Sequence, residues 1–256
     1  MELGCNGLLL GPIFASATHG YDTLDHFRID PRLGDEEDFA WLIDECRARG
    51  IHIMLDGVFN HVARTHPWVE QGLAGDTDWE GHGELATLHH GEDAVRDAVV
   101  EIMLHWLRRG IAGWRLDVAY AVPADFWADV LARVRKEFPD AMFLGEVIHG
   151  DYSSIGKAGS LDAVTQYELW KATWSSLVDV NFWELAHALE RHPVDVLPNT
   201  FVGNHDVDRI ASKVGPEKAV LAAAVLMTVP GMPSIYYGDE QGFTGVRGES
   251  WSADDA

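Results

Sequence analysis

Short apolar runs alternate along the chain with stripes of apolar residues at helical spacing. The runs have the length of β-strands, and they fall at residues 7–14, 51–55, 113–118, 142–145, 161–167, 199–203 and 234–237. The stripes predict helices at 35–49 and 93–109, a Trp-rich helix ending at about Arg191, and helices beginning at Pro123 and Pro216. Because strands and helices alternate, we expect parallel β/α units, either in an open doubly wound sheet or in a closed barrel.

Acidic residues stand at, or just beyond, the ends of four predicted strands. They are Asp56, Asp117, Glu146 and Asp206. The strands of a barrel converge with their carboxyl ends on one mouth, where active sites are built, whereas an open sheet brings only one or two strand ends to a switch point. No glycine-rich phosphate loop follows the first predicted strand. The pattern therefore predicts an α/β protein of (β/α)8 TIM-barrel type.

One segment, residues 64–91, interrupts the alternation. It is rich in Gly, His and acidic residues, and it is longer than an ordinary loop. We therefore predict that residues 64–91 form a short inserted segment after the second strand-like run, within a single domain.

The overall charge excludes several classes of partner. The 256 residues include 41 Asp and Glu against 19 Lys and Arg, which gives a formal net charge of −22. Such a surface repels phosphate backbones and anionic lipids, so we predict no nucleic-acid partner and no membrane. The most apolar stretch, residues 219–237, contains Pro230, Gly231 and Pro233 and is not expected to span a bilayer.

The predicted strand 113–118 holds the first pair of residues with a chemical interpretation. Arg115 and Asp117 are two residues apart, so they point to the same side of a strand. A guanidinium beside a carboxylate lowers the pKa of that carboxylate, so Asp117 would be ionised, as a nucleophile requires. The structural alternative is a salt bridge at the barrel mouth.

Glu146 follows the apolar strand 142–145, where a partly buried carboxyl group could act as an acid or only cap a helix.

Two histidines and a tyrosine accompany these acids. His205 lies beside Asp206, and His61 follows Asp56 by five residues. Each histidine is either a structural residue or part of a site. Tyr21, after the first predicted strand, is either a partly buried loop residue or a platform on which a sugar ring stacks.

Two mechanisms fit this set of residues. Two carboxylates can cleave a glycosidic bond, one as nucleophile and one as acid/base, with a third acid assisting. Alternatively, the acids and histidines bind a divalent metal. Arg115 favours the first mechanism, because a cation two residues before Asp117 would oppose a bound metal.

Four segments that contain these residues carry a resemblance to a known family. In chain order they are Asp56-Gly-Val-Phe-Asn-His61, Gly113-Trp-Arg-Leu-Asp117, Gly145-Glu146 and Phe201-Val-Gly-Asn-His-Asp206. They resemble the four sequence signatures of the α-amylase family, glycoside hydrolase family 13. The segments Gly11-Pro-Ile-Phe14, Gly20-Tyr-Asp22 and Gly231-Met-Pro-Ser-Ile-Tyr-Tyr-Gly-Asp-Glu240 are similar to that family too.

The resemblance implies a retaining glycoside hydrolase. Asp117 would be the nucleophile, Glu146 the general acid/base, and Asp206 a third carboxylate that grips the hydroxyls of the reacting sugar. The enzyme would cleave α-1,4, and in some relatives α-1,6, glucosidic bonds in α-glucans or maltooligosaccharides through a covalent glycosyl-enzyme intermediate. Four further residues would bind or orient the substrate: Tyr21 by stacking, His61 and His205 by hydrogen bonds, and Arg115 by orienting the nucleophile.

Within the family, the chain most resembles the neopullulanase and cyclomaltodextrinase group, which implies a cytoplasmic location. Many α-amylases have Lys-His three and four residues after the nucleophile, where the His carbonyl helps to bind calcium. Here those residues are Tyr120 and Ala121, so no cofactor is expected to be required and calcium is left as an alternative. Ile148 stands where the group often has an aromatic residue, which leaves substrate preference near the acid open.

The family barrel has eight strands, and its first strand and helix would precede the run at Leu8. We therefore expect residues 1–256 to form a single, incomplete barrel domain without the first β/α unit and the last helix. Two alternatives to hydrolysis stay open, which are transfer of the glycosyl unit to another sugar and sugar binding without catalysis. A homo-oligomer is compatible with the sequence.

Overall fold

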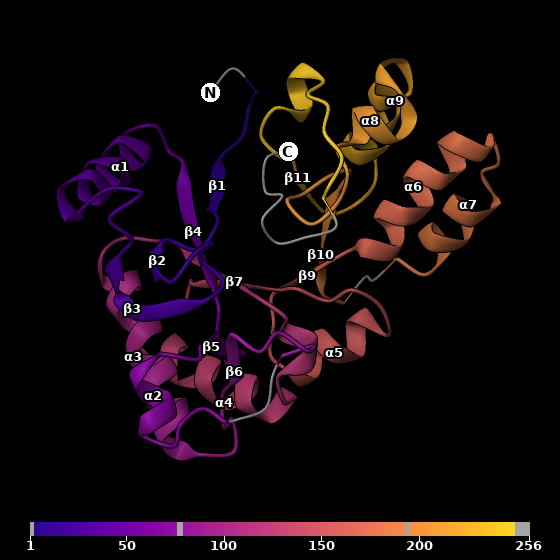
Figure 1. Ribbon diagram of the computed structural model, residues 1–256. Coiled ribbons are helices and arrows are strands. Elements are labelled where there is room, and N and C mark those ends of the chain that lie inside the picture. The colour runs from indigo at the N-terminus through magenta and orange to yellow at the C-terminus, as the bar shows by residue number, and fades with distance from the viewer. Residues whose placement is uncertain (1–2, 76–78, 193–194, 249–256) are drawn as a thin grey trace. The chain divides into compact units, whose positions relative to one another are not determined.

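The chain is described by a computed structural model (Figure 1), which covers residues 3–75, 79–192 and 195–248. The chain divides into two compact units. The first unit is Met1–Glu146 with Ile155–Asp162, and the second unit is Val147–Ser154 with Ala163–Ala256. Each unit contains a parallel sheet.

Four parallel strands form the sheet of the first unit. Their order is β1 (Gly7–Leu10), β4 (His52–Gly57), β7 (Gly113–Leu116) and β8 (Met142–Gly145). The register places Asp56 of β4 opposite Arg115 of β7. Strands β7 and β8 approach each other closely at Gly113, where a Cβ atom would lie 2.1 Å from the carbonyl oxygen of Met142. Because the strands are parallel, the carboxyl ends of β4, β7 and β8 lie at one edge of this sheet.

Three long amphipathic helices connect these strands: α1 (Glu36–Ala48), α3 (Asp93–Arg108) and α4 (Ala124–Arg135). Helix α1 begins with a capping box, in which the Asp35 side chain accepts from the backbone of Asp38 and the Asp38 side chain accepts from the backbone of Asp35. The apolar stripes face the core, and Trp106 of α3 and Trp127 of α4 are almost fully buried. The predicted helices at 35–49 and 93–109 are therefore confirmed.

Shorter elements surround the sheet of the first unit. Strand β2 (Phe14–Ser16) pairs antiparallel with β3 (Thr23–Ile29), a hairpin that the sequence pattern did not predict. The predicted excursion contains the short helix α2 (Pro67–Glu70) and strand β6 (Leu85–Thr87), which pairs antiparallel with β5 (His61–Ala63). A 3₁₀ helix, η1 (Ala119–Ala121), follows β7. Helix α5 (Tyr152–Ala158) follows β8, and its residues are divided between the two units. That residues 64–91 are an insertion into one domain stays a prediction.

Three parallel strands form the sheet of the second unit, in the order β9 (Ala163–Thr165), β10 (Leu197–Phe201) and β11 (Met232–Ser234). The helices of this unit are α6 (Tyr167–Asp179), α7 (Trp183–Glu190), α8 (Ile210–Val214) and α9 (Pro216–Thr228), followed by the 3₁₀ helix η2 (Asp239–Gln241). Leu177, Val202, Ile210, Ala222 and Leu226 form a core cluster that joins α6, α8 and α9. Each of the seven predicted strand-like runs therefore overlaps an observed parallel strand.

The prediction of one Trp-rich helix up to about Arg191 was wrong. The segment forms two helices, α6 and α7, which lie side by side (Figure 1). The break falls at Val180, whose φ of 52° is in the left-handed region and therefore ends α6. Helical apolar spacing continues across this point, so periodicity alone did not reveal the turn.

Candidate active site

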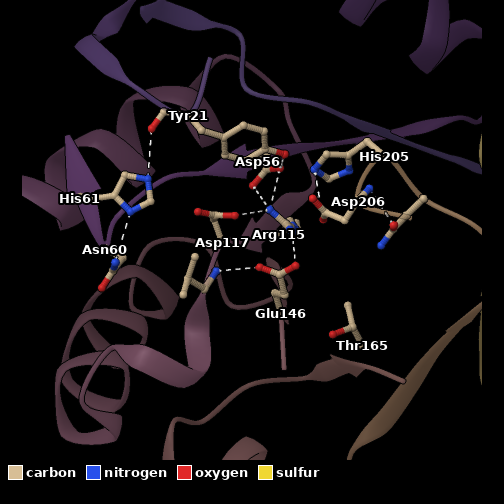
Figure 2. Close-up of polar contacts among 12 residues, drawn as sticks. Tyr21, Asp56, Asn60, His61, Arg115, Asp117, Glu146, Thr165, His205 and Asp206 are labelled. Carbon is tan, nitrogen blue, oxygen red and sulfur yellow. Dashed lines mark hydrogen bonds and ion pairs between the residues drawn. The ribbon is translucent and has the colours of Figure 1, made fainter. Parts of the chain in front are cut away.

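Arg115 is the centre of a buried ion cluster in the first unit (Figure 2). Its Nη1 atom lies 2.9 and 2.8 Å from the two carboxylate oxygens of Asp56 and 2.7 Å from Oδ1 of Asp117. Its Nη2 atom lies 2.7 Å from Oε1 of Glu146. The three carboxylates come from the carboxyl ends of β4, β7 and β8, so the parallel sheet itself brings them to one guanidinium.

The cluster holds more negative than positive charge in a site shielded from water. Arg115, Asp56, Asp117 and Glu146 are each no more than 6% exposed. Burial raises the pKa of Asp117 well above its ordinary value, and although Arg115 acts in the opposite direction, Asp56 and Glu146 add to the rise. Burial disfavours the charge of Arg115, yet Asp56 and Glu146 hold the pKa of the guanidinium well above its ordinary value. Asp117 in this cluster is therefore more easily protonated than an ordinary aspartate.

This direction is the opposite of the low pKa that the sequence predicted for Asp117. The prediction counted only one carboxylate beside Arg115, which would leave the pair neutral. In the structure the same cation is shared among three carboxylates, so it cannot compensate all of them. Protons in such a cluster belong to the coupled groups together rather than to one residue.

A backbone donor fixes the second oxygen of Glu146. The N–H of Val118 donates to Oε2 of Glu146 at 2.9 Å, and the N–H of Tyr120 donates to the carbonyl oxygen of Glu146 at 3.3 Å. Val118 has a φ of 49°, a left-handed conformation that is strained for a β-branched residue. In this conformation the N–H of Val118 points to the carboxylate of Glu146.

Tyr21 and His61 join the same site through hydrogen bonds. The Tyr21 hydroxyl donates to Oδ2 of Asp56 at 3.0 Å. Nε2 of His61 lies 3.1 Å from the carbonyl oxygen of Tyr21, and Nδ1 of His61 lies 3.2 Å from Nδ2 of Asn60. Because a carbonyl oxygen only accepts, His61 carries its proton on Nε2 and accepts from Asn60 at Nδ1. Burial lowers the pKa of His61 to about 4, so its ring is neutral near pH 7.

His205 and Asp206 lie together in the second unit, beyond the end of β10. Nε2 of His205 is 3.4 Å from Oδ2 of Asp206, which also accepts from the hydroxyl of Tyr167 at 3.3 Å. Asn204 donates through Nδ2 to that hydroxyl at 2.8 Å, and its Oδ1 accepts from the backbone of Asp206 at 2.9 Å. Arg247 donates from Nη1 to Oδ1 of Asp206 at 3.3 Å. Asp206 is therefore held by hydrogen bonds and ion pairs with residues of the second unit.

Comparison with known families decides how this chain is classified. The sequence profile described as "Alpha amylase, catalytic domain" matches residues 1–80 and 76–256. The chain belongs to the α-amylase family.

Named relatives agree with this membership. The chain is 32% identical over 280 residues to a cyclomaltodextrinase of Geobacillus thermopakistaniensis (95% of this chain, 47% of that protein). It is 31% identical over 277 residues to an intracellular maltogenic amylase of Bacillus subtilis (95% of this chain, 47% of that protein). The similarity to the cyclomaltodextrinase group is thus confirmed, and the chain spans about half the length of these relatives.

A solved structure confirms the fold class. The ligand-free cyclic alpha-maltosyl-(1→6)-maltose hydrolase of Arthrobacter globiformis matches with a TM-score of 0.88 at 28% identity. The match covers 98% of this chain and 65% of that one. The (β/α)8 type predicted from the alternation of strands and helices is therefore the fold of this α-amylase family member.

Sequence reasoning missed several partners of the α-amylase site residues. Asp56 was noted as a strand-end acid, but its ion pair with Arg115 depends on the register between β4 and β7. Asn60 stands inside a signature segment, which was the available signal for its contact with His61. Nothing in the local sequence indicated that Tyr167 and Arg247 contact Asp206.

The described part of the chain shows neither a metal-binding cluster nor a membrane-spanning helix. Within residues 3–75, 79–192 and 195–248, no group of three or more His, Cys, Asp or Glu side chains is placed to hold a metal ion. No helix of the described residues is long and apolar enough to cross a bilayer. The predictions on cofactors and on partners stay predictions.

Proposed function

We propose that this chain carries the catalytic centre of a retaining hydrolase that cleaves α-1,4, and some α-1,6, glucosidic bonds in α-glucans or maltooligosaccharides. The observation that carries the proposal is the shared guanidinium: Asp117 binds Nη1 and Glu146 binds Nη2 of Arg115. Retaining glycosidases need two carboxyl groups close enough for one to attack the sugar directly while the other protonates the leaving oxygen. The binding of Asp117 and Glu146 to the two terminal nitrogens of one guanidinium supports such closeness.

In this mechanism Asp117 attacks the anomeric carbon and Glu146 donates its proton to the departing glycosidic oxygen. The bond to the leaving group breaks, and an ester forms between Asp117 and the sugar. Glu146 then takes a proton from water, which attacks the same carbon and releases Asp117. The first step requires Asp117 as a carboxylate while Glu146 carries the proton. Arg115, bound to both residues, keeps each carboxyl group in place during the exchange.

Four other residues would bind the sugar, as the resemblance to the α-amylase family implies. Asp206 would hold the hydroxyls of the reacting sugar, with His205 beside it. Tyr21 would stack on the ring, and its hydroxyl bond to Asp56 limits how far the phenol can move. His61 can bond a sugar only by sharing or exchanging a partner, because both ring nitrogens already have one.

The substrate class rests on the names of the relatives, which act on cyclomaltodextrins and on a cyclic maltosyl-maltose. The name of the intracellular relative from Bacillus subtilis likewise supports a cytoplasmic location. We extend both properties to this protein as parts of the proposal.

The stereochemistry of the product tests the retaining mechanism. With maltotriose as substrate, we expect the first product released to be the α-anomer, because two displacements at the same carbon restore its configuration. Proton NMR during the first turnovers, before mutarotation, distinguishes the anomers. Initial release of the β-anomer would mean a single displacement and would reject Asp117 as a covalent nucleophile.

A Glu146→Gln variant tests the acid. We expect hydrolysis of maltotriose to fall by ~10²–10⁴-fold, the usual contribution of a general acid. A glycoside with an activated aryl leaving group needs no protonation, so its first step should fall far less. Burst kinetics with the aryl substrate measure that step directly. Equal losses on both substrates would show that Glu146 has another role.

A further inference from the structure

The second unit contains a polar cavity that the proposed mechanism does not use. Its volume is about 290 Å³, and it is lined by Gly150, Asp151, Tyr152, Ser153, Glu168 and Arg191. A cavity of this size holds far more than one water molecule and lies at the lower end of ligand pockets. Its lining begins four residues after Glu146 in the chain, and it includes the first turn of α6 and the residue that follows α7.

Hydrogen bonds within the protein fix one wall of this cavity. The Tyr152 hydroxyl donates to the carbonyl oxygen of Ile148 at 3.1 Å and accepts from the backbone N–H of Glu168 at 3.2 Å. Asp151 accepts from both the backbone and the hydroxyl of Ser154, at 3.0 and 2.7 Å. These groups are engaged in the structure, so the wall is formed before any ligand arrives.

Glu168 and Arg191 differ from the rest of the lining, because they keep hydrogen-bonding capacity for a ligand. Glu168 accepts one long bond at Oε1, from the N–H of Gly150 at 3.3 Å. Arg191 faces the same cavity, yet its side chain makes no ion pair or hydrogen bond with any residue of the described ranges. The Glu168 carboxylate and the Arg191 guanidinium thus line the same cavity without forming an ion pair.

The chemistry of this arrangement selects a neutral polyol. A hydroxyl group donates to a carboxylate and accepts from a guanidinium, so neighbouring hydroxyls can join Glu168 to Arg191. A simple cation would satisfy only the carboxylate, and a simple anion only the guanidinium. Tyr152, the one aromatic lining residue, is 6% exposed, so the ligand is bound through hydroxyls rather than by stacking.

We propose that this cavity binds one glucose unit of an α-glucan, through its hydroxyls, at a site separate from Asp117 and Glu146. The inference rests on the proposed function for the identity of the sugar. A second binding site would hold long or released chains while leaving hydrolysis of short substrates unchanged.

The test is a calorimetric titration of the full chain with maltotriose, in an Asp117→Asn background that cannot consume the ligand. We expect two binding sites. Added Glu168→Gln or Arg191→Met should each weaken one site by about ten-fold or more, because the first replaces a charged acceptor with a neutral one and the second removes the guanidinium donors. The matched control is Glu190→Gln, which changes an exposed acid next to Arg191 that does not line the cavity, and it should keep both sites.

One binding site in the background, or two sites unaffected by both cavity substitutions, would overturn the inference. Turnover of a chromogenic maltotrioside by the chain with Asp117 intact, measured beside the titration, separates this result from a failure of the proposed function. If that chain hydrolyses the maltotrioside and the cavity variants bind normally, the inference alone is wrong. If the chain with Asp117 intact does not hydrolyse the maltotrioside, but the cavity variants lose one binding site, the proposed function is wrong and the cavity site stands.

Discussion

An Asp117→Asn variant is expected to lose maltotriose hydrolysis by ~10⁴-fold or more while remaining folded. Loss of the group that forms a covalent intermediate removes a whole reaction path, and such losses are large in other enzymes with nucleophilic residues. The amide keeps the size of the carboxyl group and can still accept a hydrogen bond from Arg115. Initial rates and thermal unfolding of the two proteins, measured on the same preparations, provide the check.

The difference in stability between this variant and the parent should also depend on pH, in a direction set by Asp117 of the parent. The pKa of Asp117 is raised in the folded chain, so the protonated form contributes stability that is lost as the pH rises through the folded pKa. The Asp117→Asn variant has no such proton to lose. Its unfolding temperature relative to the parent should therefore increase as the pH rises above the ordinary range of an aspartate. A variant that retains full activity, or one that unfolds at neutral pH, would contradict this account.

Local periodicity predicted the contacts that depend on neighbours in sequence. Arg115 and Asp117 were placed on the same side of a strand because side chains alternate there, and their atoms lie 2.7 Å apart. The buried stripe of α3 followed from the spacing of Val95, Val99, Ile102 and Trp106. These features need no knowledge of how distant segments meet.

The electrostatics of the site could not be predicted in this way. The sign of the pKa shift at Asp117 depends on Asp56, which lies 59 residues from Arg115 in the chain and reaches it through strand register. The sequence pattern indicates the adjacent Arg115, but it does not indicate that Asp56 and Glu146 bind the same guanidinium. The hairpin β2–β3 was missed for a related reason, because its pairing shifts register twice and shows no clean alternation.

Replacement of Arg115 with methionine should destabilise the chain by ~3–5 kcal/mol at neutral pH. Removing one partner of a buried ion pair leaves the other charge uncompensated, and here three carboxylates lose their common cation. Methionine fills much of the same space, so little of the loss comes from packing. Denaturant unfolding of the full chain measures the change in free energy.

Arg133→Met is the matched control, because Arg133 also bridges two carboxylates, Asp97 and Asp129, but at the surface. It should cost at most about 1 kcal/mol, since exposed ion pairs are screened by water. The Arg115→Met deficit should shrink as the pH falls, because protonation discharges the carboxylates that the arginine had neutralised. If both variants were equally stable at neutral pH, the cluster would not carry the buried negative charge that the mechanism requires. A deficit that stayed constant from neutral to acid pH would assign the effect to packing rather than to charge, and would leave Arg115 without the role of neutralising the buried carboxylates.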